Sequence, residues 1–159
     1  MNKYLYPLLL GLMFLSSCSG NTMKTMTSGQ WFSVEYPSDW KSGTETRAGV
    51  SFTDKTSGGI IVVSKNTMTD PTKKANSDFL KWYQSQKTLD TSGEISFGGK
   101  NGMYVIYSNT YGTLSFTHKD AWGIDGDTIY SLACTIPQKS KESLMKICDT
   151  MITSFKMVP

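Results

Sequence analysis

The sequence predicts an α+β sandwich, in which an antiparallel sheet carries helices. Three observations lead to this fold class. Short segments alternate apolar and polar side chains, as strands with one buried face do. Turns rich in glycine separate many of these segments. Two other stretches repeat their apolar residues every three or four positions, which is typical of amphipathic helices.

The first strands are expected between residues 32 and 63. Alternation over residues 32–36 and 50–52 predicts two of them, and Pro37 ends the first because proline lacks the N–H for a ladder hydrogen bond. Residues 60–63 are instead continuously apolar and β-branched, which is typical of a central strand covered on both faces. We therefore expect a layer on each side of the sheet.

The first helix is expected after Asp70 and Pro71, because the aspartate can cap the first turn and the proline ring presets a helical φ. The stripe predicted to face the sheet consists of Ala75, Phe79, Trp82, Tyr83, Gln86 and Leu89. The second helix is expected after Ser140, with Glu142 near its positive end. Its residues at helical spacing are Leu144, Cys148, Met151, Ile152 and Phe155.

Between the two helices, the turns predict antiparallel hairpins. Residues 93–97 and 103–107 flank the glycine-rich turn 98–102, and residues 114–122 and 129–136 flank Asp125 and Gly126. Along the chain we therefore expect several strands, one helix, several more strands and a final helix.

Cys18 follows Lys3, an apolar run over residues 8–15 and two serines. That run is too short to span a bilayer, which takes ~20 residues, and is typical of a signal peptide. Residues 15–18, Leu-Ser-Ser-Cys, resemble the lipobox of bacterial lipoproteins, which implies cleavage before Cys18 and a lipid on its thiol. We expect a signal peptide over residues 1–17, a lipidated cysteine and flexible tether over 18–29, and one domain over 30–159.

The lipobox resemblance implies attachment to a membrane of the bacterial cell envelope through the lipid. Ser19 stands where an aspartate would resemble an inner-membrane retention signal, which favours the outer membrane, facing the periplasm. The formal net charge of the chain is +3, and removing Lys3 leaves 15 basic and 13 acidic side chains. So small an excess argues against nucleic acid as a partner.

Three short segments resemble PsbP-like domains. Residues 31–40, Trp-Phe-Ser-Val-Glu-Tyr-Pro-Ser-Asp-Trp, are similar to the first strand of these domains and its aromatic-Pro-x-x-Trp turn. Residues 128–132 and 152–156 resemble the last strand and the end of the terminal helix. The resemblance, which extends to bacterial DcrB-type proteins, implies an α/β/α sandwich around a central antiparallel sheet. It implies no reaction, because relatives include photosystem subunits, a nuclear transport cofactor and chaperone-like adaptors.

The sequence contains little that predicts catalysis. His118 is the only histidine, which argues against a metal site built from several imidazoles. Neither a Gly-x-Ser-x-Gly elbow nor a phosphate-binding loop is present. Asp120, Asp125 and Asp127 surround Trp122 without the spacing of a calcium-binding EF-hand. We expect no catalytic residue, cofactor or metal, and a binding or accessory module for an envelope protein or a small ligand. The alternative is an enzyme with an unfamiliar site around His118 and the three aspartates.

Aromatic side chains are the remaining binding candidates, because they are enriched at interfaces. We expect Trp40 to be structural and Trp82 to belong to the buried helix stripe. Trp31, Tyr111 and Trp122 are less constrained and are the residues expected to contribute to binding.

Cys134 and Cys148 are expected to form a disulfide. Cys134 shares the apolar face of the last strand, Cys148 lies in the apolar stripe of the next helix, and that helix should run back over the strand. An oxidising envelope favours closure of the bond. The alternative is a pair of buried free thiols, which are common hydrophobic residues.

Overall fold

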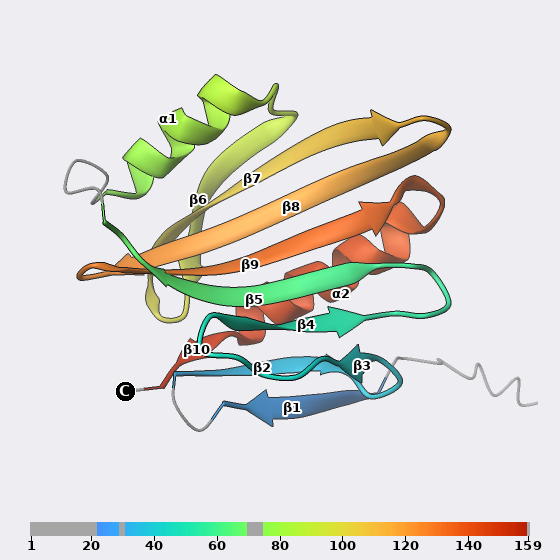
Figure 1. The fold of residues 1–159 in the computed structure, drawn as a ribbon, viewed down its shortest axis with the longest axis horizontal. Helices are drawn as coiled ribbons and strands as arrows, with labels where there is room; N and C mark the ends of the chain where they lie inside the picture. Colours follow the sequence, from blue (N-terminus) through green and yellow to red (C-terminus); the bar gives the residue numbers. More distant parts are fainter. Residues whose placement is uncertain (1–21, 29–30, 70–74, 159) are drawn as a thin grey trace, which may run out of the picture.

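The computed structural model describes residues 22–28, 31–69 and 75–158, and strands with their tight turns make up most of these residues. Within these residues, seven antiparallel strands form one sheet, here named the large sheet (Figure 1). From edge to edge, its order is β3 (Lys41–Ser42), β4 (Gly49–Thr53), β5 (Ile60–Thr67), β9 (Thr128–Pro137), β8 (Leu114–Asp125), β7 (Lys100–Tyr111) and β6 (Thr91–Phe97).

The predicted hairpins are present. Gly98 and Gly99 join β6 to β7 with φ angles of 61° and 82°, and Gly126 stands in the β8–β9 turn with a φ of 60°. These left-handed conformations favour glycine because it has no Cβ. The first turn is shorter than expected, since Lys100 already belongs to β7.

A small sheet joins the two ends of the described chain. It consists of β1 (Met23–Thr27), β2 (Phe32–Pro37) and β10 (Lys156–Met157), with β2 in the middle. Residues 23–27, which we expected in a flexible tether, are thus a strand in register with β2. An edge strand is paired through backbone hydrogen bonds, which form with polar as well as apolar side chains. The polar composition of residues 23–27 therefore gave no sign of a strand. Cys18 lies outside the described residues.

Helix α2 (Lys141–Ser154) follows a short 3₁₀ turn (Gln138–Ser140) and packs between β2 and the large sheet. Four of the five residues predicted from its spacing are buried within the helix, and Phe155 is buried just after it. With the inner faces of both sheets they form the larger core. Trp40 lies in this core, as expected.

Helix α1 (Asn76–Gln86) lies on the opposite face of the large sheet, against β7 and β8 (Figure 1). Its contacts with that face form a smaller core around Val105, Tyr107 and Trp122. The predicted capping pair, Asp70 and Pro71, lies outside the described residues. Helices on both faces of an antiparallel sheet confirm the predicted α+β class and its α/β/α layering.

The expectation that residues 60–63 are covered on both faces is wrong. In β5, Ile61 and Val63 are buried, but Ile60 is 42% exposed and Val62 is 38% exposed. Helix α1 covers only one end of its face, so the part of that face over β5 carries no second layer (Figure 1). We name this uncovered part of the sheet, which carries the exposed Ile60 and Val62 of β5, the open face. None of the described helices is long and apolar enough to cross a membrane.

Candidate functional site

A pocket of about 360 Å³ opens between α1 and the large sheet. Phe79, Trp82 and Tyr83 line it from the helix, and Asp120 and Trp122 line it from β8. The residues that complete its lining are Asn66, Thr67, Met68, Thr69, Ala121, Ile129, Ser131 and Ala133. Its size and largely apolar lining are those of a small-molecule site.

Aromatic rings from α1 and β8 form part of the pocket wall. The Tyr83 and Trp122 rings are stacked at 5.2 Å between centroids, and Phe79 meets Trp122 at 6.5 Å. Trp122 is almost fully buried, and its Nε1 has no hydrogen-bond partner among the described residues. Trp82 packs edge-on against Tyr83 but is 43% exposed. It lies at the rim and not in the buried stripe we expected, because α1 buries no residue completely.

Asp120 is the buried polar group of the pocket, with 7% of its surface exposed. The hydroxyls of Tyr83 and Tyr107 donate hydrogen bonds to its Oδ2 at 2.9 Å and 3.2 Å. No hydrogen bond from the described residues reaches its Oδ1. Burial raises the pKa of Asp120, although the two hydrogen bonds oppose this shift. Burial and then the negative charge of Asp120 raise the pKa of both tyrosines.

His118 lies beside this cluster, two residues before Asp120 on β8. Its ring stacks on Tyr107 at 4.7 Å between centroids. Its Nε2 lies 3.0 Å from Asn109 Oδ1 and its Nδ1 lies 3.3 Å from Thr135 Oγ1. Burial lowers the pKa of His118, which favours the neutral ring. Both ring nitrogens are thus engaged by neighbouring polar side chains.

The four residues of the alternative enzyme site do not come together. His118 and Asp120 are neighbours, but Asp125 pairs with Lys100 at 3.1 Å near the β8–β9 turn. Asp127 lies in that turn, after the end of β8. Among the described residues, no group of three or more His, Cys, Asp or Glu side chains is placed to hold a metal ion.

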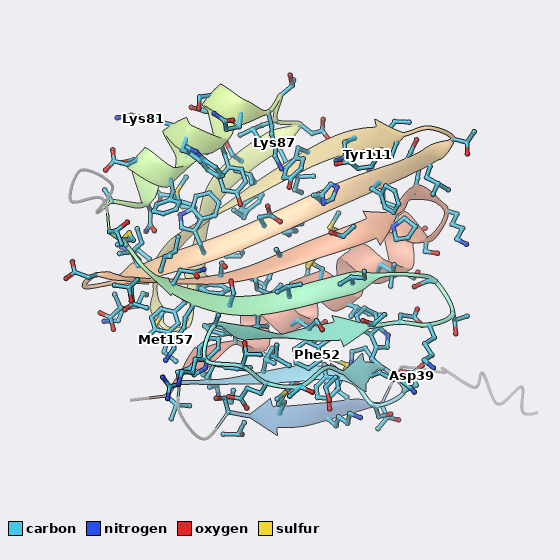
Figure 2. All side chains as sticks on the ribbon, viewed as in Figure 1. Asp39, Phe52, Lys81, Lys87, Tyr111 and Met157 are labelled. Carbon is cyan, nitrogen blue, oxygen red and sulfur yellow. A yellow bond between two sulfur atoms is a disulfide. The ribbon has the colours of Figure 1, made fainter. Side chains whose placement is uncertain are left out.

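The predicted binding aromatics occupy three different environments. Trp31 is buried in the larger core, where it packs on Phe32 and Tyr130, so it lies on the α2 side of the large sheet. Trp122 lines the pocket. Tyr111 is 67% exposed at the end of β7, beyond the part that α1 covers (Figure 2). The structure therefore brings only Trp122 to the pocket.

The predicted disulfide between Cys134 and Cys148 is present, with 6.3 Å between the Cα atoms. It ties β9 to α2 inside the larger core. It lies on the opposite side of the sheet from the pocket.

The exposed large apolar side chains gather on one side of the molecule. Within the described part of the chain they are Ile60, Val62, Trp82, Tyr111 and Leu114. Ile60 and Val62 alternate with the buried Ile61 and Val63, so they lie on the open face. Leu114 and its register partner Tyr111 share the face of β8 that carries Asp120 and Trp122. Trp82 stands on α1 at the border of this face. Sequence reasoning did not find this grouping, because it depends on how far α1 extends.

No protein-family model and no curated protein matches the sequence. Solved structures do match. Cyanobacterial PsbP (CyanoP) from Synechocystis is 15% identical over 91% of this chain and 99% of its own, with a TM-score of 0.62. LpqN of Mycobacterium tuberculosis, described as involved in cell envelope biogenesis, is 14% identical over 87% of this chain and 91% of its own, with a TM-score of 0.59.

A crystal structure from Bacteroides thetaiotaomicron is 19% identical over 81% of this chain, with a TM-score of 0.59. This chain spans 46% of that longer protein. At these identities the likeness concerns the fold, and it confirms that the described domain has the PsbP-like fold.

Proposed function

We propose that this chain, a domain of PsbP-like fold, is a non-enzymatic binding or accessory module of the bacterial cell envelope. The observation that carries the proposal is the open face with the aromatic pocket at its border. Large exposed apolar groups gathered on one side of a soluble domain are typical of an interaction surface. A largely apolar pocket with few polar groups is typical of a ligand site.

Three observations support the envelope location. Residues 15–18 resemble a lipobox, so the proposed anchor is a lipid on Cys18 that holds the domain on the outer membrane, facing the periplasm. The disulfide between Cys134 and Cys148 suits an oxidising compartment. LpqN, one of the similar structures, is described as acting in cell envelope biogenesis.

The geometry favours binding over catalysis. An enzyme of the alternative kind needs a base and a nucleophile within hydrogen-bond reach of each other and of a substrate. His118 is held by Asn109 and Thr135 and is not part of the pocket lining. The acidic residues that would have extended the site, Asp125 and Asp127, lie near the far end of β8.

The proposal is tested by ligand binding with product analysis on the purified, lipidated protein. Small aromatic compounds are screened by the change they cause in tryptophan fluorescence, because Trp82 and Trp122 line the pocket. Trp82→Ala should weaken binding of the hits, and Tyr111→Ala, an exposed aromatic outside the pocket, should not. His118→Ala should leave binding unchanged.

The bound compound should be recovered with its mass unchanged. Conversion of the compound to a product, lost in His118→Ala or Asp120→Asn, would refute the binding proposal and support the enzyme. Equal binding by the wild type and Trp82→Ala would show that the ligand sits elsewhere.

A further inference from the structure

The described residues that line the pocket carry charge of one sign only. Asp120 is the only residue of its described lining that carries a full charge in its ionised form near neutral pH, and the lining contains no lysine, arginine or histidine. Two basic side chains, His118 and Lys87, lower the pKa of Asp120, and neither is among the described lining residues. Lys87 places its Nζ 3.8 Å from the centroid of the Tyr107 ring. Among the described lining residues, an anionic ligand would therefore meet a carboxylate and no cation to offset it.

The carboxylate of Asp120, which lines the pocket, has unused capacity to accept hydrogen bonds. Both tyrosine hydroxyls donate to Oδ2, whereas no hydrogen bond from the described residues reaches Oδ1. Oδ1 is not among the fully buried unpaired atoms of the described residues, so it remains accessible. An ionised carboxylate accepts several hydrogen bonds, and burying one without a paired charge is costly. Because burial disfavours the charged carboxylate, it raises the pKa of Asp120. A cation that donates to Oδ1 would reduce it.

The walls favour a cation as well. Phe79, Trp82, Tyr83 and Trp122 contribute aromatic rings to the same pocket. The face of an aromatic ring attracts cations, and tryptophan does so most strongly. Aromatic walls with one carboxylate are a chemically consistent set of groups for an ammonium ion carried on an apolar body.

We infer that the pocket beneath α1 binds an organic ammonium cation, with Asp120 as its anionic partner and Trp82 as the aromatic group at its entrance. This inference rests on the proposed binding function and specifies its ligand class. The apolar body of the ligand lies against Phe79 and Trp122, and its ammonium group donates a hydrogen bond to Asp120 Oδ1.

The test compares three probes of similar shape and different charge: phenethylammonium, phenethyl alcohol and hydrocinnamate. Their dissociation constants are measured by calorimetry with the purified, lipidated protein at neutral pH. Phenethylammonium should bind most tightly and hydrocinnamate most weakly. A hydrogen-bonded charge pair in a partly buried site corresponds to a preference of roughly ten- to a hundredfold for the cation over the alcohol.

Asp120→Asn should remove most of this preference, because the amide keeps an oxygen for the two tyrosines but carries no charge. Binding of phenethyl alcohol should fall by a smaller factor than binding of phenethylammonium, because the alcohol loses no charge pair. An unfolding midpoint no lower than that of the wild type shows that the variant is folded. Trp82→Ala should weaken phenethylammonium binding, and Tyr111→Ala should not.

The outcomes separate this inference from the function on which it rests. Equal binding of all three probes, with loss in Trp82→Ala, would overturn the cation assignment and leave the binding function in place. A preference for hydrocinnamate would do the same. Absence of binding by every probe at millimolar concentration would overturn the cation assignment, and the proposed function would then depend on the fluorescence screen alone.

Discussion

Loss of the disulfide should destabilise the domain by an amount set mainly by the length of the loop that it closes. Cys134 and Cys148 are separated by 14 positions in the sequence. In the chain-entropy model, closing a loop of about 15 residues stabilises the folded state by ~3 kcal/mol. For a domain of this size, that corresponds to a fall in Tm of about 10 °C. The double variant Cys134→Ala/Cys148→Ala should lose slightly more, because both sulfur atoms are buried in the larger core.

Urea unfolding followed by tryptophan fluorescence, with and without a phosphine reductant, measures this effect. The wild type should lose stability on reduction, and the double variant, as the matched control, should be insensitive to the reductant. The reasoning is refuted if the wild-type midpoint does not move on reduction. It is also refuted if two free thiols titrate in the unreduced, unfolded protein.

Three further predictions address the anchor, the buried carboxyl and the sheet. Cys18→Ser should abolish acylation and block signal cleavage, because the thiol is the group that accepts the lipid. Mass spectrometry of the N-terminus measures both effects. An unmodified wild-type N-terminus at another residue would contradict the lipid anchor. Asp120→Asn should be at least as stable as the wild type at neutral pH, because a carboxyl whose pKa is raised on folding stabilises the fold only when protonated. This advantage should shrink as the pH falls through the folded pKa of Asp120 toward its ordinary value of 3.8, and unfolding midpoints that show it growing would contradict the raised pKa. Gly102→Ala should destabilise the domain by about 1–3 kcal/mol, because a Cβ there would lie 2.4 Å from the Trp122 carbonyl oxygen; a change in unfolding free energy below about 0.5 kcal/mol would show that the strands adjust.

The strands and hairpins were predictable because their signals are local. Alternation over residues 32–36 reports a strand with one buried face, and glycines at positive φ report the turns. The extent of the layers was not predictable in the same way. Ile60 and Val62 are as apolar and β-branched as Ile61 and Val63, so the sequence of β5 does not distinguish a covered face from an open one. That distinction depends on where α1 ends.

The candidate site was predicted in part. Trp122 and Asp120 were both singled out, but Asp120 was grouped with Asp125 and Asp127, to which it is close in sequence only. The alternation of β8 could have placed Asp120 correctly. It shares one face of the strand with His118 and Trp122, and that is the face that α1 covers. Its hydroxyl partner on Tyr83 comes from a distant segment, and no local pattern links the two residues.

The two helices are attached to the sheet with unequal strength. Helix α2 contributes Leu144, Cys148, Met151 and Ile152 to the core and is bonded covalently to β9, whereas α1 has no fully buried residue. Backbone amide protons exchange with solvent when a segment unfolds locally, and the free energy of that local unfolding is larger where more side chains are buried. Those of α2 should exchange only when the whole domain unfolds, and those of α1 should exchange through a much smaller opening. We therefore expect the pocket wall formed by α1 to open far more readily than the half of the molecule held by α2, which should keep its shape.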